Sequence, residues 1–300
     1  MNLGNRHRPL VVQLFLWLIY SHQAVWGQGW RELIEKADSA FAHRQVDMAV
    51  QFGREAHDLA RKEYSASDTT MAMLYERLGR YSLTRGGLFK EAAELFERAL
   101  KIREAEVGMH DSSLVNILLP LGASYFQNAE YTTAEKIFNR LIGLSEESFG
   151  PNSIKTQRGL DILGSLYSVT GRSKEAEVIN RKNLAIRLTM FGPDRAEVAV
   201  SLQNLSTICL EQGKFLDAES LSVRALSIFR RAYGSESIQV AGPLNNMGQI
   251  YYEEGRKLDA KRTFLNALRL KETSAGMTST SLISTLNNLG VVYGDLGFPD

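Results

Sequence analysis

The amino-acid sequence predicts an all-α protein, an α-solenoid built of antiparallel helix pairs. Three observations support this prediction: a period of 42 residues runs through most of the chain, apolar residues within each period follow helical spacing, and glycines recur where helices should end. Such a period is typical of stacked helical repeats, because one helix pair cannot bury its apolar face alone. The composition, 44% hydrophobic and 23% charged over 300 residues, fits an ordinary folded chain.

Four sequence columns repeat in phase, at intervals of 42 residues apart from one interval of 43 in the first repeat. The leucine–glycine column holds Leu78-Gly79, Leu121-Gly122, Leu163-Gly164, Leu205-Ser206, Met247-Gly248 and Leu289-Gly290. The aromatic column holds Tyr125, Tyr167, Cys209, Tyr251 and Tyr293, and the alanine column Ala92, Ala134, Ala176, Ala218 and Ala260. The glycine column holds Gly108, Gly150, Gly192, Gly234 and Gly276. Agreement among four columns excludes a chance pattern.

Residues 1–27 are predicted to be a secretory signal peptide. Arg6 and Arg8 precede an apolar run of eleven residues, and a cleavage site follows at Gly27. The run is shorter than the ~20 residues that a membrane-spanning helix needs. An uncleaved anchor is the alternative. We therefore expect an exported chain, periplasmic or secreted, with no membrane association after cleavage.

Residues 28–66 are predicted to form a degenerate helix pair that caps the N-terminal end of the array. Ala49 and Ala56 lie 43 residues before Ala92 and Ala99, which places them in the repeat register. Terminal repeats are usually atypical, because one of their faces meets water. The solenoid proper is expected over residues 67–300.

Each repeat is predicted to contain two helices separated by a glycine. In the fourth repeat, Val198, Leu202, Leu205 and Cys209 share one helical face, and Gly213 follows as a helix end. A second apolar face then leads to the column glycine Gly234. This pattern divides the chain into five full repeats at about 69–113, 114–154, 155–197, 198–239 and 240–281, followed by a half repeat at 282–300.

The half repeat has a first helix without a second. Its predicted apolar face, with Leu289, Val292, Tyr293 and Leu296, should pack on a partner. Exposing such a face would forfeit roughly 1.5–3 kcal/mol per large side chain. The sequence therefore predicts that residues 282–296 receive either a C-terminal region of a longer protein or a second copy of the chain.

These columns resemble the tetratricopeptide repeat (TPR), in the 42-residue variant of kinesin light chains. The resemblance covers about Thr69 to Asp300 and departs from the pattern at Ser206, Cys209, Leu141 and Asn183. The matching positions are Leu163-Gly164, Tyr167 and Ala176, then Phe96, Phe138 and Phe264 with Ala99, Ala225 and Ala267. The resemblance implies a right-handed TPR superhelix that binds a protein or peptide in a concave groove lined by its first helices.

Composition and motifs argue against enzymatic or nucleic-acid functions. The formal net charge of +1 provides no broad field for nucleic acid, and Cys209, as the single cysteine, forms neither an internal disulfide nor a CxxC motif. Peptidase, hydrolase and nucleotide-binding motifs are lacking, and His43, His57 and His110 are spaced too widely for a metal site. We expect no enzymatic activity, no cofactor and no metal.

Amide side chains recur just before the leucine–glycine column in three consecutive repeats, as Gln203-Asn204, Asn245-Asn246 and Asn287-Asn288. Amides offer both a donor and an acceptor, which suits recognition of a peptide main chain. The candidate groove residues are these six together with Gln249 and Tyr252, near Glu211 and Glu253. The alternative role for the asparagines is to bond neighbouring helices and hold their register.

The favoured function is an exported, non-enzymatic scaffold that binds a peptide or protein partner. An alternative, again by resemblance, is the N-terminal regulatory or sensor array of a longer protein whose output domain, a CHAT-type peptidase or a sensor kinase, lies outside this sequence. A third hypothesis is a structural assembly module that stacks through its open end.

Overall fold

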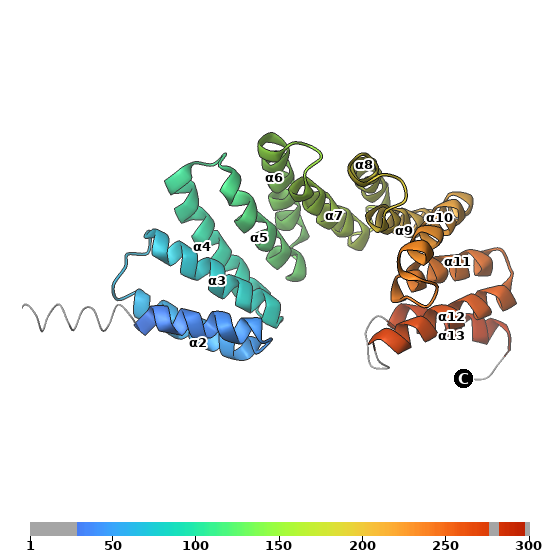
Figure 1. Ribbon diagram of the computed structural model, residues 1–300, viewed down its shortest axis with the longest axis horizontal. Helices are drawn as coiled ribbons and strands as arrows, with labels where there is room; N and C mark the ends of the chain where they lie inside the picture. The colour runs from blue at the N-terminus through green and yellow to red at the C-terminus, as the bar shows by residue number, and fades with distance from the viewer. Residues whose placement is uncertain (1–28, 276–281, 298–300) are drawn as a thin grey trace, which may run out of the picture. The chain divides into compact units, whose positions relative to one another are not determined.

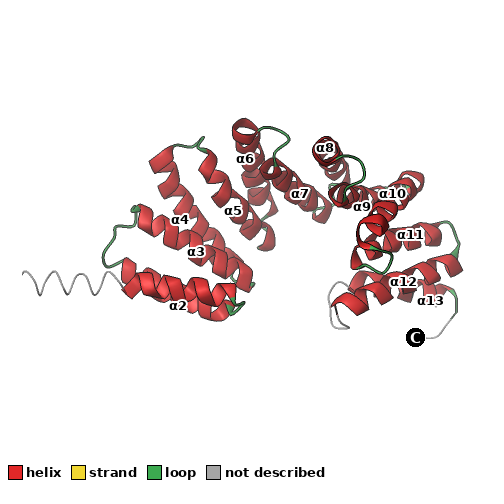
Figure 2. Cartoon of the chain, in the orientation of Figure 1, coloured by secondary structure: helices red, strands yellow, loops and turns green. Residues whose placement is uncertain are grey.

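The computed structural model describes residues 29–275 and 282–297 (Figure 1). This part of the chain contains helices and turns and no strand (Figure 2), which confirms the all-α prediction. The predicted signal peptide, residues 1–27, lies outside the described residues, as do parts of the last full repeat and of the half repeat.

The chain forms two compact units, and the boundary between Leu144 and Ser145 falls within α6. The first unit contains a helix at 29–42, α2 (Val46–Ala60), α3 (Thr69–Arg85), α4 (Phe89–Val107), the short 3-10 helix η1 (Ser112–Leu114), α5 (Val115–Gln127) and the start of α6 (Tyr131–Phe149). The second contains the end of α6, then α7 (Ile154–Val169), α8 (Ser173–Phe191), α9 (Ala196–Glu211), α10 (Phe215–Tyr233), η2 (Ile238–Val240), α11 (Ala241–Glu253), α12 (Lys257–Ala275) and α13 (Ile283–Asp295).

Consecutive helices pack as pairs, and a small residue on the first helix permits the close approach. Phe264 of α12 lies against Gly248 of α11, where a Cβ atom would come within 2.7 Å of the ring. The same relationship joins Phe96 to Gly79 and Phe138 to Gly122. The aromatic residue follows the glycine by 16 or 17 residues, and this pairing has a packing cause: the ring needs the volume that a side chain would occupy.

Two repeats form this contact without a phenylalanine: Asn180 of α8 lies against Gly164 of α7, and the next repeat has a pair of serines. At the position of the glycine, α9 carries Ser206, and at the position of the aromatic residue, α10 carries Ser222. The two hydroxyl oxygens lie 2.6 Å apart, and the Ser206 hydroxyl also donates to the carbonyl oxygen of Ala218 at 2.9 Å. Both serines are fully buried, so a satisfied polar contact replaces the ring-on-glycine contact.

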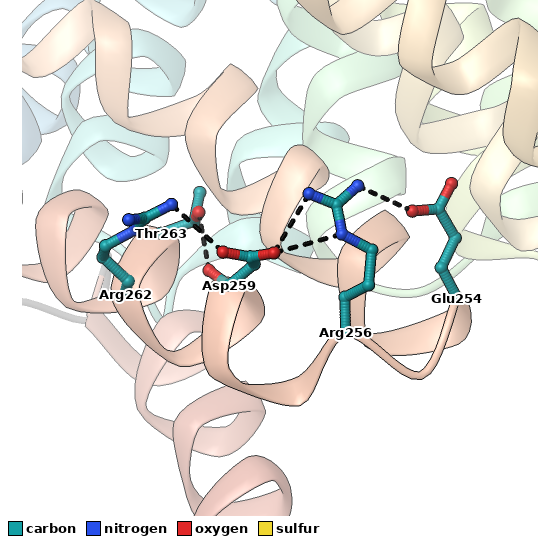
Figure 3. A network of polar contacts seen from close by, with 5 residues as sticks. All are labelled: Glu254, Arg256, Asp259, Arg262 and Thr263. Carbon is teal, nitrogen blue, oxygen red and sulfur yellow. Dashed lines mark hydrogen bonds and ion pairs between the residues drawn. The ribbon is translucent and has the colours of Figure 1, made fainter.

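The turn between the two helices of a pair is held by a recurring arginine. At the α11–α12 turn, the Arg256 guanidinium lies 4.2 Å from the centroid of the Tyr251 ring and donates to Asp259 and Glu254 (Figure 3). Arg262 donates to the other oxygen of Asp259. Asp259 stands in the first turn of α12, where a negative charge is favourable for the helix dipole.

Second helices end at the glycine column, as the sequence predicts. Gly108, Gly192 and Gly234 are the C-caps of α4, α8 and α10, with φ between 81° and 87°. This backbone conformation is costly for residues with a side chain. The fifth member of the column, Gly276, lies outside the described residues.

Of the aromatic column, Tyr167 and the exception Cys209 are buried, whereas Tyr125, Tyr251 and Tyr293 are half-buried. Cys209 is 0% exposed and packs with Leu210, Ala218 and Ile250. Burial raises the pKa of the Cys209 thiol, so the unreactive thiol form predominates at neutral pH. Among the helices of residues 29–275 and 282–297, none is both long enough and apolar enough to cross a membrane.

Candidate peptide-binding face on the first helices

The predicted groove residues lie on three first helices of the second unit. Helix α9 contacts α11, and α11 contacts α13. Because the repeat is 42 residues long, Gln203, Asn245 and Asn287 occupy equivalent positions on these helices. We call the set formed by Gln203, Asn204, Asn245, Asn246, Gln249, Tyr252, Asn287 and Asn288 the first-helix face.

Asn246 links α11 to α9. Its Nδ2 atom lies 3.1 Å from the hydroxyl oxygen of Thr207 and 3.4 Å from the main-chain oxygen of Gln203. The residue is only 7% exposed. Its amide group is therefore committed to the contact between the two helices, which is the register-holding role considered from the sequence.

Gln203 lies across the start of α11. A Cβ atom added to Gly242 would come within 2.5 Å of the Gln203 side-chain amide, so the glycine leaves room for this side chain. The Gln203 side chain is half-buried. Two of the eight residues on the first-helix face thus owe their positions to contacts between neighbouring repeats.

Two further contacts join α11 to α13. The Thr285 hydroxyl donates to the Asn245 Oδ1 atom at 3.0 Å and accepts from the Lys271 Nζ atom at 2.7 Å. Thr285 is fully buried, and burial lowers the pKa of Lys271. The Tyr252 hydroxyl donates to the Asp295 Oδ2 atom at 2.8 Å, and this bond raises the pKa of the tyrosine.

The remaining residues of the first-helix face are accessible. Asn204 and Asn287 are exposed, and Gln249 and Asn288 are half-buried. The asparagines predicted to be equivalent therefore differ, because Asn204 is exposed where Asn246 is buried. The accessible amides present donors and acceptors on α9, α11 and α13 in turn. Glu211 and Glu253, at the ends of α9 and α11, are exposed, and partial burial raises the pKa of Glu211.

A buried ionic contact on the preceding pair was not predicted from the sequence. The Arg187 guanidinium of α8 donates to the Asp161 Oδ2 atom of α7 at 2.5 Å and to the Ser201 hydroxyl of α9 at 2.9 Å. The Asn183 amide donates to the other oxygen of Asp161 at 2.6 Å. Burial raises the pKa of Asp161, and these donors lower it by less. The one sequence feature that could have indicated this contact is Arg187 itself, because the equivalent position of the next repeat holds the apolar residue Phe229.

The first helix of the half repeat has an open face. A Cβ atom on Gly290 would meet nothing within 4 Å, whereas the equivalent glycines Gly79, Gly122 and Gly248 each meet a phenylalanine ring. Ile283, Leu286 and Val291 are 54%, 47% and 54% exposed. Leu289 and Val292 pack on the preceding pair, with Ala260 and Phe264. We call Ile283, Leu286, Gly290 and Val291 the open α13 face.

Groups of acidic, histidine and cysteine side chains that could hold a metal ion are absent from the described part of the chain. The arrangement of the first-helix face offers hydrogen bonds and apolar contacts, and it brings together no nucleophile with a base.

Comparison with known proteins identifies the repeat. Residues 160–231 and 197–273 match the tetratricopeptide repeat family. Among curated proteins, no sequence matches significantly. The fold resembles BtubC (BKLC) from P. vanneervenii, with 24% sequence identity, a TM-score of 0.57, and coverage of 70% of this chain and 85% of that one.

Two other solved structures have similar folds. One is a kinesin light chain of Podosopora anserina whose TPR-like repeats are nearly identical to one another. It aligns with a TM-score of 0.59 and 15% identity, over 69% of this chain and 98% of that one. The apo form of RapI aligns with a TM-score of 0.60 and 14% identity, over 90% and 98% of the two chains. Residues 160–273 thus match the tetratricopeptide repeat, and the fold of the chain resembles that of solved helical-repeat proteins.

Proposed function

We propose that this chain is an exported, non-enzymatic scaffold that binds an extended peptide segment along its first-helix face. The observation that carries this proposal is the run of accessible amides on helices that contact one another, from Asn204 on α9 through Gln249 on α11 to Asn287 on α13. A peptide crossing the three helices would meet a donor and an acceptor on each. Repeat scaffolds commonly offer extended surfaces of this kind.

The experiment uses peptides selected by phage display against the chain from residue 28 onward, with affinity measured by fluorescence anisotropy. The double variant N204A/N287A removes two exposed amides and should weaken binding at least tenfold. The matched control is Asn266→Ala, which removes an exposed amide from the second helix α12. Unchanged affinity in the double variant would reject the first-helix face as the binding surface.

Export is a separate part of the proposal, and the amino-terminal sequence pattern supports it. The protein recovered from its source should begin at Gln28 and be found outside the cytoplasm. Amino-terminal sequencing after cell fractionation measures both properties. A cytoplasmic chain that retains residues 1–27 would contradict the proposal.

A second candidate function is favoured by the open α13 face. We infer that this face receives an amphipathic helix that places a large apolar side chain beside Gly290, as Phe264 does beside Gly248. A regulatory array that contacts an output domain, or a second copy of the chain, would meet this requirement. The occupant has the side-chain pattern of the chain's own second helices, because those helices fill the equivalent position elsewhere.

A peptide with the sequence of residues 257–275, the segment of α12, tests this inference as a surrogate occupant. It should bind the chain, and the peptide variant Phe264→Ala should not. Gly290→Leu in the chain should block binding, whereas Gly294→Leu, a control with the same gain in helix propensity, should leave it unchanged. Equal binding by both variants would exclude the open α13 face. Sedimentation of the chain alone identifies a second copy as the occupant if the mass rises with concentration.

A further inference from the structure

A pocket in the first unit arises where a second helix ends early. Helix α2 ends at Ala60, whereas the repeat register of α4, which ends at Val107, places the equivalent residue at Tyr64. In the turn that follows α2, the amide nitrogens of Glu63 and Tyr64 both donate to the Ala60 oxygen. The Tyr64 ring then packs edge-on against Trp30, with centroids 5.9 Å apart. The segment that follows stands beside α4 in place of a regular last turn.

The pocket has a volume of about 520 Å³ and lies between this segment and α4. Ala66 and Ser67 line one side, and Tyr75 of α3 and Ile102 of α4 are buried lining residues, 4% and 8% exposed. The volume falls within the ~300–1,000 Å³ that is usual for small-ligand sites. No residue of the first-helix face takes part, since the pocket is confined to the first unit.

Two cations on α4 complete the lining. Arg98 and Lys101 are exposed, and within the described residues neither forms an ion pair with a carboxylate. The Arg98 guanidinium lies 5.8 Å from the centroid of the Tyr75 ring. The surface of this pocket is thus mainly apolar, with positive charge at one side and no acidic lining residue.

A second ring packs against Tyr75, which lines one side of the pocket. His57 of α2 lies 5.3 Å from Tyr75 between ring centroids, and its Nε2 atom is buried without a hydrogen-bond partner in the described structure. Burial lowers the pKa of His57, so its ring is mainly neutral at pH 7. Hence the positive charge that a ligand meets comes from Arg98 and Lys101.

We propose that this pocket binds an apolar carboxylic acid. The carboxylate contacts Arg98 and Lys101, and the apolar body lies against Tyr75, Ile102 and Ala66. A planar guanidinium and an ammonium group suit a carboxylate, and the arginine stacks on an aromatic ring while it does so. Two sources present this chemistry: a free aryl or alkyl acid, and the C-terminus of a peptide whose last side chain is apolar.

Four probes distinguish charge from apolar contact and separate the two sources. They are 4-phenylbutyrate, the uncharged 4-phenylbutanol, the tripeptide Gly-Gly-Phe and its C-terminal amide. Calorimetry on the chain from residue 28 onward gives affinity, and the NMR shift of the Ile102 methyl group reports the location. At least one acid should bind with a Kd on the order of 1 mM or tighter, and its uncharged counterpart at least tenfold more weakly.

Variants test the assignment of residues. R98Q/K101Q should weaken binding of the acid at least tenfold, whereas Lys90→Gln, which removes an exposed lysine from α4 outside the pocket, should not change it. Ala105→Phe narrows the pocket and keeps both cations, and it should also abolish binding. Binding by the free acid alone or by the tripeptide alone identifies the source. Absence of saturable binding by every probe, or binding that R98Q/K101Q leaves unchanged, would overturn the proposal.

Discussion

Phe264 of α12 occupies the space that a side chain on Gly248 of α11 would need, and on α13 the equivalent space beside Gly290 is empty. The two glycines stand in the same sequence column, 42 residues apart, yet their surroundings differ. The first permits a ring to pack against the backbone of a helix, whereas at the second no atom of the described chain lies within 4 Å of the Cβ position.

Alanine substitution should have opposite effects at these two glycines. Gly248→Ala places a Cβ atom 2.7 Å from the Phe264 ring, and overpacking of this kind costs about 1–3 kcal/mol of unfolding free energy. Gly290→Ala meets no atom within 4 Å and should stabilise the chain by up to about 1 kcal/mol through helix propensity. Urea unfolding followed by circular dichroism measures both. Equal effects would show that the ring does not depend on the glycine.

The serine pair between α9 and α10 should behave as a coupled unit. Ser222→Phe alone brings a ring against the Ser206 side chain and should destabilise the chain. Ser206→Gly alone leaves the buried Ser222 hydroxyl without its partner, a cost of about 1–3 kcal/mol. The double variant S206G/S222F recreates the glycine–phenylalanine contact of other repeats. It should be more stable than the sum of the single effects, and simple additivity in a double-mutant cycle would contradict the pairing.

Replacing Arg187 alone should lower the unfolding free energy more than replacing Arg187 and Asp161 together. Arg187→Met leaves Asp161 with only the Asn183 amide as a donor and removes the donor to the buried Ser201 hydroxyl. The loss should be about 2 kcal/mol, less than the ~3–5 typical of fully buried pairs, because the Asp161 side chain is 33% exposed. D161N/R187M should recover part of it, since Phe229 shows that the next repeat tolerates an apolar residue here. A double variant less stable than Arg187→Met would disprove this account.

Protonation of His57 should destabilise the first unit as the pH falls. Burial is the largest influence and lowers the pKa of His57 below its ordinary 6.5; the Asp58 carboxylate opposes the shift, and Arg61 and Arg98 add to it. The folded state therefore favours the neutral ring. Stability is fully present above pH 6.5 and declines as the pH falls through 6.5 toward the lower folded-state pKa, by at most about 1.4 kcal/mol per pH unit.

The measurement is the unfolding free energy of the first unit between pH 7.5 and 5.5. His57→Gln should remove this component of the pH dependence, and the control His43→Gln, at an exposed ring, should retain it. Identical pH profiles for the His57 variant and the unmodified chain would show that this ring does not titrate as inferred.

Much of the fold was predictable because its determinants are local. Apolar spacing identified each helix, and the glycine column identified the ends of second helices, since the backbone at Gly108 and Gly234 adopts positive φ. The early end of α2 was not predictable in this way. Its sequence, from residue 61 onward, lacks the glycine that closes the other second helices, and no local signal showed the pocket that results.

The sequence predicted which helices carry the asparagines, but not which of their side chains are exposed. Periodicity placed the asparagines on consecutive first helices, and it predicted the same role for Asn204, Asn246 and Asn288. Packing separates them, because Asn246 faces Thr207 on the neighbouring helix whereas Asn204 is exposed. The acceptors of Arg187 were likewise not predictable, since Asp161 and Ser201 lie 26 and 14 residues away along the chain.

Local patterns along the chain were thus sufficient for the helices, their pairing and the repeat, because backbone preferences and apolar periodicity act over a few residues. Contacts between helices decided which amide is buried, which glycine holds a ring, and which cations line a pocket. Those outcomes depend on side chains that stand many residues apart, about 16 for Gly248 and Phe264 and 39 for Asn246 and Thr207, and only the packed helices bring them within a few ångströms of one another.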